Sequence, residues 1–176
     1  MDELDVAAGV GLAPALRIEP VRYTDPDVVA MVAEVQAEYT VRYGGPDKTP
    51  LDPAMFDPPS GAFFVGYLPG TGGDRRAVAM GGWRFREDVA GLGRSRAAEI
   101  KRMYVAATSR RAGLARRVLG HLEDTARSAG ADLMVLETGL EQPEAIALYE
   151  SSGYRPVEGF GYYQWSPLVR YFGKPL

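Results

Sequence analysis

The chain contains no cysteine and one histidine, His121. Without cysteine it can form no disulfide, no zinc finger and no thiolate nucleophile, so covalent catalysis through sulfur is excluded. A single histidine is too few for a histidine-built metal site, and we therefore expect no metal. His121 lies within a helical pattern next to Leu122 and is assigned no role.

Long hydrophobic runs are also missing. The longest uncharged apolar run, residues 6–16, is broken by glycines and a proline, and it is far shorter than the ~20 residues of a membrane helix. It follows Asp2, Glu3 and Asp5, where a secretory signal would carry positive charge. We therefore expect a cytoplasmic protein with no membrane partner.

A strongly basic balance is absent as well, because the formal net charge is -3. Nucleic-acid binders are usually basic, so we expect no nucleic-acid partner. The positive charge is nevertheless uneven, since Arg110, Arg111, Arg116 and Arg117 fall within eight residues. This cluster either meets a small anion or forms a solvated helix face.

The bulk composition is that of one globular domain. The chain has 176 residues, of which 46% are hydrophobic and 24% charged, and a domain of this length buries roughly two-thirds of its unfolded surface. Residues 1–13 are small, acidic at the front and aperiodic, which predicts a flexible N-terminal arm. Residues 14–176 then form a single domain.

Alternating and helical patterns divide this domain into an α/β fold. Asp25 can cap the first helix, Gly44 follows its end, and Gly130 closes the second helix. The proline-rich segment 44–60 is expected to be a surface loop with at most a short helical turn. The expected strands are 15–22, 61–68, 77–85, 97–105, 131–138, 153–157 and 169–176, and the expected helices are 26–43, 114–130 and 143–153.

The turn between Val105 and Leu114 carries the clearest chemical signal. A helix that begins in a tight glycine-containing turn leaves its first N–H groups unpaired, and these groups with the helix dipole form an anion site. Gly113 and the small Ala115 allow a phosphate to approach closely, and the arginines add charge. Neither the P-loop pattern nor the dinucleotide-binding glycine pattern occurs, so this is another type of anion turn.

The segment "MYVAATSRRAGLARRVL" resembles the acyl-CoA-binding motif of the GNAT superfamily of N-acetyltransferases, Arg/Gln-x-x-Gly-x-Gly/Ala after an apolar strand. Arg110, Gly113 and Ala115 occupy its fixed positions. "QPEAIALYESSGYRPV" resembles the second motif of the family, with Tyr149 at the expected offset and Gln142 where the family often has asparagine. The order of elements also agrees over most of the chain.

This resemblance implies a single-domain GNAT-like fold. Its mixed sheet would be mostly antiparallel, with six or seven strands, helices on both faces and a parallel strand pair splayed at the acyl-CoA site. It also implies acetyl-CoA as co-substrate, with its pyrophosphate on the backbone of residues 111–116 and its pantetheine arm along the strand edge. The implied cofactor-binding residues are Met103, Tyr104, Val105, Arg110, Arg111, Ala112, Gly113, Leu114, Ala115, Arg116, Gln142 and Ala145.

Two residues receive catalytic roles from the same resemblance. Glu99 would be the general base, with a pKa raised by burial in the cleft; the alternative is a strand residue facing solvent or paired with Lys101. Tyr149 would be the general acid toward the leaving thiolate, and the alternative is a core aromatic. The free N–H of Val105 or its neighbour is the candidate donor to the developing oxyanion.

The acceptor side is expected at the end of the strand 131–138 and in the aromatic loop that follows it. Glu137 and Thr138 would open onto this side, and Phe160 and Tyr162 would form walls of the acceptor pocket. Alternatively, Glu137 caps the turn that follows the strand, and the aromatic residues belong to the core or to a dimer surface. The expected activity is direct transfer of acetyl from acetyl-CoA to a primary amine of a small molecule or peptide. One alternative is a non-catalytic acyl-CoA-binding domain, and another is a protein that binds the phosphates of a nucleotide. The exposed aromatic residues are also compatible with a homodimer.

Overall fold

A seven-stranded sheet organises the protein, and the computed structural model describes residues 15–176. The strand order is β1-β2-β3-β4-β5-β7-β6, in which the β4–β5 pair is parallel and all others are antiparallel. The expected fold class is therefore confirmed; the predicted arm, residues 1–13, lies outside the described residues. The strands are β1 (Arg17–Val21), β2 (Gly61–Pro69), β3 (Arg75–Arg86), β4 (Ala97–Val105), β5 (Leu133–Gly139), β6 (Arg155–Pro156) and β7 (Val169–Pro175).

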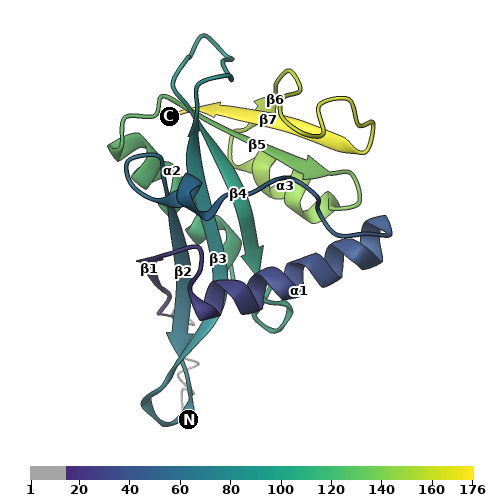
Figure 1. The fold of residues 1–176 in the computed structure, drawn as a ribbon. Coiled ribbons are helices and arrows are strands. Elements are labelled where there is room, and N and C mark those ends of the chain that lie inside the picture. Colours follow the sequence, from purple (N-terminus) through teal and green to yellow (C-terminus); the bar gives the residue numbers. More distant parts are fainter. Residues whose placement is uncertain (1–14) are drawn as a thin grey trace, which may run out of the picture.

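Helix α1 (Pro26–Tyr43) covers one face of the sheet (Figure 1). Asp25 caps it by accepting a hydrogen bond from the Asp27 amide, and Gly44 ends it in the left-handed conformation at φ 77°. Both ends match the expectation because they depend on residues next to the helix. The helix buries Val28, Met31 and Val35 against β2–β4 and the short helix η1 (Pro53–Phe56), whereas Val29 is 59% exposed.

Helices α2 (Leu114–Ser128) and α3 (Pro143–Ser151) cover the opposite face (Figure 1). The expected apolar stripe of α2 is buried there, from Leu114 through Val118 and Leu122 to Ala126. Tyr149 of α3 packs into the same core. The sheet therefore lies between α1 on one face and the α2–α3 layer on the other.

The central strands β4 and β5 separate soon after they begin. Their pairing extends only over Ala97–Glu99 with Leu133–Val135, and Figure 1 shows the two strands diverging toward their carboxyl ends. Within β4, the register with β3 shifts near Gly82 and Arg102 adopts a positive φ of 56°. This β-bulge turns β4 away from β5, so that the sheet opens between the two strands.

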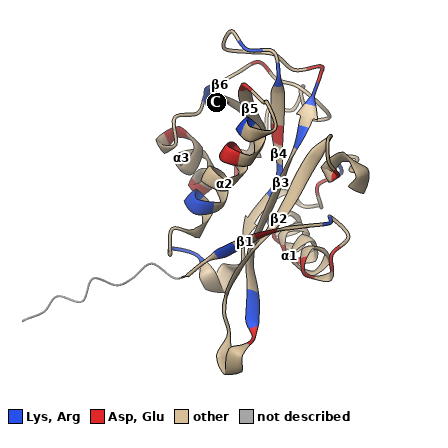
Figure 2. Cartoon of the chain, turned by 90° about the vertical axis from the view of Figure 1, so that its left-hand side faces the viewer, with Lys and Arg blue, Asp and Glu red and all other residues tan. Residues whose placement is uncertain are grey.

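Charged residues of both signs are interspersed along the elements in Figure 2. Among the helices of residues 15–176, none is both long enough and apolar enough to span a membrane. In the same residues, no group of three or more histidine or carboxylate side chains is placed to hold a metal ion.

Candidate active site

A cleft of about 650 Å³ lies where β4 and β5 diverge. Its walls come from the ends of these strands, the start of α2, one side of α3 and the facing side of α1. Most of the predicted cofactor residues meet here, although the structure does not place Ala112 in the wall. The predicted residues that line the cleft are Met103, Tyr104, Val105, Arg110, Arg111, Gly113, Leu114, Ala115, Arg116, Glu137, Thr138, Gln142, Ala145 and Tyr149.

The backbone at the start of α2 is open toward this cleft. Arg111 and Gly113 adopt left-handed conformations with φ values of 65° and 72°. In the described part of the chain, the amides of residues 111–116 donate no hydrogen bond, and the first amide that does so belongs to Arg117, which donates to the Gly113 carbonyl. Six consecutive N–H groups at a helix start, with the helix dipole behind them, are suited to bind an anion.

The arginines of this segment differ in what they contact. Arg110 pairs with Glu38 of α1 and donates from Nε to the Val105 carbonyl at 3.0 Å. Arg116 donates to the hydroxyls of Ser151 and Ser152 at the end of α3. Arg111 is exposed and has no partner among residues 15–176, so its guanidinium is the one of the three available to an anion.

The edge of β4 that faces β5 is unpaired beyond Glu99. The Ala106 amide donates to the Val78 carbonyl of β3 at 2.9 Å. Because successive amides of a strand point to opposite edges, the Val105 amide points into the gap. It can therefore pair with a ligand lying along β4 or with an oxyanion there.

Tyr149 reaches the cleft from α3. Its ring is 6% exposed and packs edge-on against Tyr154 with ring centroids 5.6 Å apart. Its hydroxyl makes no hydrogen bond within the described residues. Burial, with Tyr39 adding to it, raises the pKa of Tyr149 above its usual value, so the phenol keeps its proton at neutral pH.

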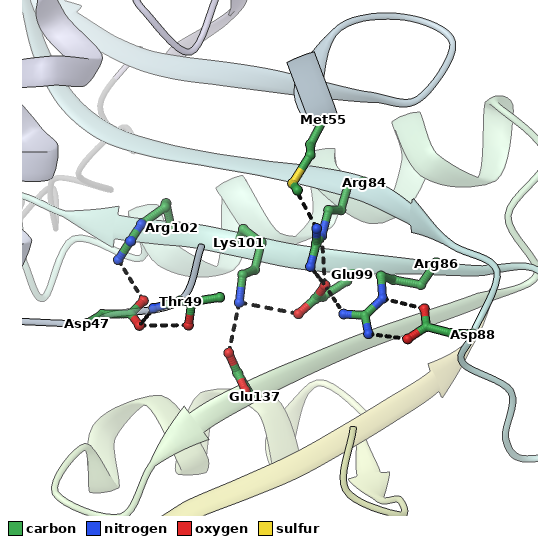
Figure 3. A network of polar contacts seen from close by, with 10 residues as sticks. All are labelled: Asp47, Thr49, Met55, Arg84, Arg86, Asp88, Glu99, Lys101, Arg102 and Glu137. Atoms are coloured by element: carbon green, nitrogen blue, oxygen red, sulfur yellow. Dashed lines mark hydrogen bonds and ion pairs between the residues drawn. The ribbon is translucent and has the colours of Figure 1, made fainter. Parts of the chain in front are cut away.

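Glu99 lies in a buried charge network rather than in the cleft (Figure 3). Its carboxylate is 1% exposed and pairs with Arg86 at 2.7 Å, Arg84 at 2.9 Å and Lys101 at 3.3 Å. Burial alone would raise the pKa of Glu99, but Lys101, Arg84 and Arg86 outweigh it and hold that pKa below its usual range. The predicted raised pKa is wrong, because the two arginines come from β3 and Glu99 precedes the divergence of β4 from β5.

Glu137 of β5 stands at the junction of two cavities. Lys101 holds its Oε1 at 2.8 Å, while Oε2 is buried and has no hydrogen-bond partner among the described residues (Figure 3). The side chain is 14% exposed and lines both the main cleft and a smaller cavity. Of the two glutamates predicted to act at the site, Glu137 is the one with an oxygen that no donor among the described residues engages.

The smaller cavity measures about 180 Å³ and adjoins the cleft at Tyr39, Glu137, Thr138 and Gln142. Thr138 therefore lines both cavities. Phe160 does not line it, because this ring is buried against Tyr171, with centroids 5.1 Å apart. Tyr162 does not line it either, being 57% exposed and packed edge-on against Tyr163.

Several residues of the smaller cavity were missed by the sequence reasoning. They include Tyr39, on α1, and Tyr163, which follows Tyr162 in the aromatic loop. Asp47 lies in the proline-rich loop, which Arg102 anchors by an ion pair of 2.9 Å. Tyr163 accepts a hydrogen bond from the Lys48 amide at 2.9 Å. The polar residues of the proline-rich loop were the signal in the sequence that could have pointed to this cavity. Arg102 and Tyr163, which contact the loop, are far from it in the sequence.

Comparison with solved structures agrees with this architecture. An acyl-CoA N-acyltransferase from Klebsiella pneumoniae subsp. pneumoniae is 28% identical with a TM-score of 0.72, covering 92% of this chain and 98% of its own. The GNAT domain of S. lividans PAT has a TM-score of 0.67 at 17% identity, with coverage of 92% and 90%, and supports the fold alone.

A curated relative, an IAA acetyltransferase from Azospirillum brasilense, is 44% identical over 78 residues. The match covers 44% of this chain, and the chain spans about half the length of that relative, 51%. None of these comparisons bears on the predicted cytoplasmic location or on the predicted homodimer, so both stay predictions. Residues 29–154 match the family model described as Acetyltransferase (GNAT) family, and the expected acyltransferase class is confirmed at the level of the family. The chain belongs to the acetyltransferase (GNAT) family.

Proposed function

We propose that the protein transfers an acetyl group from acetyl-CoA directly to a primary amine. The observation that carries this proposal is the row of unbonded amides at residues 111–116, beside the gap between β4 and β5. A diphosphate is an anion of the size and charge that such a row binds. Arg111 adds a positive charge with no competing partner among the described residues.

The gap itself suits the extended arm of coenzyme A. An arm lying along β4 would pair like an added strand with main-chain groups on its unpaired edge, Met103 among them, and would leave the Val105 amide for the acyl carbonyl. Gln142, the N-cap residue of α3, and Ala145 within α3 line the other wall of the cleft. The thioester would then arrive near Glu137 and Tyr149, which both line the same cleft.

An amine must lose a proton before it can attack. An alkyl ammonium with a pKa of ~10.4 is neutral in about one molecule in several thousand at pH 7, which corresponds to roughly 4.6 kcal/mol. We assign the proton acceptor to Glu137 in place of Glu99. Oε2 of Glu137 is buried and has no hydrogen-bond partner among the described residues, in a side chain that lines the cleft, whereas both oxygens of Glu99 are engaged by cations.

The remaining steps use groups already described. As the amine nitrogen bonds to the acyl carbon, the Val105 amide donates to the carbonyl oxygen, which gains negative charge. When the carbon–sulfur bond breaks, Tyr149 donates its proton to the departing thiolate. The proton that the ammonium loses before attack passes to Glu137 and then to solvent, and the second proton, which the nitrogen loses as the amide forms, replaces through solvent the one that Tyr149 donated. The products are therefore the amide, free coenzyme A and one proton.

Release of free thiol is the direct test. The protein is incubated with acetyl-CoA and a panel of primary amines. IAA is tested beside the panel, because the Azospirillum brasilense relative is named an IAA acetyltransferase. Binding of acetyl-CoA is measured by calorimetry in parallel. We expect thiol release that depends on both acetyl-CoA and an amine. Tight binding without thiol release from any acceptor would instead identify a non-catalytic acyl-CoA-binding domain.

A further inference from the structure

We infer that the acceptor is a compact primary amine with an apolar body of about one ring and no carboxylate. This inference rests on the proposed acetyl transfer and adds the class of amine to it. Its basis is the 180 Å³ cavity that adjoins the cleft at Glu137, to which no part of coenzyme A is assigned.

The volume of this cavity limits the size of the acceptor. An apolar cavity of about 150 Å³ holds one benzene molecule, so 180 Å³ holds a single ring or a branched aliphatic group of similar size. A body with several rings does not fit within it. The ammonium end is placed by the shared wall, since Glu137 and Thr138 border both the small cavity and the cleft.

The charges of the lining favour an amine and disfavour a carboxylate. Among the described residues, the lining holds two carboxylates, Asp47 and Glu137, and no lysine, arginine or histidine. Asp47 is engaged by Arg102 at 2.9 Å, and Lys101 engages only one oxygen of Glu137. A bound ammonium group would supply the donor that the buried Oε2 of Glu137 lacks, whereas a carboxylate would be desolvated without a cation to compensate it.

The walls away from Glu137 are suited to an apolar body. Tyr43, Tyr163, Leu168 and Val169 contribute them. Two of these rings are held by their hydroxyls: Tyr43 accepts a hydrogen bond from Gln142 Nε2 at 3.2 Å, and Tyr163 accepts one from the Lys48 amide. Because the hydroxyls are engaged, the rings present mainly apolar surface to a bound molecule.

Matched amines test this inference. 2-Phenylethylamine and phenylalanine differ by one carboxylate, and a multi-ring aminoglycoside tests size; free thiol is measured at saturating acetyl-CoA. We expect kcat/KM for 2-phenylethylamine to exceed the values for phenylalanine and for the aminoglycoside at least tenfold. Equal or better use of either competitor would overturn the inference while leaving acetyl transfer intact.

A binding measurement separates the two proposals if no amine is acetylated. 2-Phenylethylamine and phenylalanine are then titrated into the protein saturated with coenzyme A and followed by NMR. Preferential binding of 2-phenylethylamine supports the inferred pocket even though the transfer reaction has failed. Equal binding of the two, or binding of neither, contradicts it.

A lysine placed in the lining gives a second test. Ser166 borders the small cavity and is only half-buried, so Ser166→Lys should be tolerated and supply the missing cation. We expect kcat/KM for phenylalanine, relative to 2-phenylethylamine, to rise about tenfold. Ser128→Lys adds the same charge at the far end of α2 and should leave this ratio unchanged; no rise in Ser166→Lys argues against the role given to lining charge.

Discussion

Lys101 Nζ lies 2.8 Å from Glu137 Oε1 and so holds one carboxylate oxygen of a residue on the neighbouring strand. The same ammonium lies 3.3 Å from Glu99 and is 6% exposed. Lys101 and Glu99 share one face of β4, since they are two residues apart. The buried network therefore fixes the orientation of Glu137 at the point where the strands open.

Removing the carboxylate charge of Glu137 should impair catalysis. Glu137→Gln keeps an oxygen for Lys101 but cannot accept a proton, so we expect kcat to fall roughly 10²- to 10⁴-fold, the usual contribution of a general base. The Kd of acetyl-CoA should change little, because Glu137 is not among the amides at the start of α2. Steady-state kinetics and calorimetry measure the two effects.

Glu150→Gln provides the control for this substitution. Glu150 is an exposed carboxylate on α3 that forms no ion pair among residues 15–176 and lies outside both cavities. The Glu150→Gln substitution should therefore leave kcat near the wild-type value. A Glu137→Gln enzyme with unaltered kcat and pH profile would remove Glu137 from the role of base.

Glu99 should matter for stability more than for chemistry. Glu99→Gln leaves Arg84 without a carboxylate partner, whereas Arg86 keeps Asp88 and Lys101 keeps Glu137. Breaking a buried pair of this kind costs about 3–5 kcal/mol. Denaturant unfolding at pH 7 measures the loss. Glu19→Gln, which breaks the exposed pair with Arg75, should change the free energy of unfolding far less.

The same carboxylate predicts how stability depends on pH. The pKa of Glu99 in the folded protein lies below its usual value of 4.5, so the folded state binds this proton less readily than the unfolded state. Its contribution is complete above about pH 4.5 and is lost as pH falls through the lower folded pKa. In wild type, unfolding free energy should therefore drop on acidification, and Glu99→Gln should flatten this drop; an unchanged slope would contradict the assignment.

Tyr149→Phe should slow turnover without abolishing it. The variant keeps the ring packing and removes only the proposed proton donor. Because a thiolate with a pKa of ~8.5 is already a fair leaving group, we expect kcat to fall by roughly 10²-fold, the low end for acid catalysis. Tyr154→Phe, which removes a nearby buried hydroxyl outside the cleft, should leave kcat unchanged. If only the KM for acetyl-CoA responds to Tyr149→Phe, Tyr149 is a binding contact.

Gly113→Val should weaken acetyl-CoA binding by blocking the anion site. A Cβ at Gly113 meets no protein atom within 4 Å and would project into the space beside the free amides. We expect Kd to rise at least tenfold, about 1.4 kcal/mol, when measured by calorimetry. Gly72→Val is the matched control, because Gly72 has nearly the same backbone (φ 81°, ψ 16°) as Gly113 (φ 72°, ψ 8°) and equal open space.

Both valine variants should lose similar stability, roughly 1–2 kcal/mol, since both place a β-carbon in the left-handed region. Because both variants lose the same stability, a change in Kd seen only in Gly113→Val reports on acetyl-CoA binding and not on backbone strain. A Kd that rises equally in the two variants would trace the effect to unfolding, and an unaltered Kd in Gly113→Val would remove the pyrophosphate from this turn.

Features that depend on neighbouring residues were predictable. The bounds of α1 follow from Asp25 and Gly44, and the strand-to-helix turn follows from Gly113 and the apolar patterns around it. The bulge at Arg102 was not predictable, because nothing in "IKRMYV" requires a positive φ there. It depends on how β4 pairs with β3.

The sequence by itself determined the order of strands and helices, the open turn at the start of α2 and the motif residues of the family, because each is encoded within a few consecutive residues. Only the tertiary structure showed how the surroundings of Glu99 and Glu137 differ, and the proposed base role of Glu137 rests on that difference. Arg84 and Arg86 come from one neighbouring strand and Glu137 from the other, and the charge of a carboxylate is set by the groups around it in space. The smaller cavity also exists only in the folded protein, because its walls come from α1, the proline-rich loop, β5 and the segment before β7.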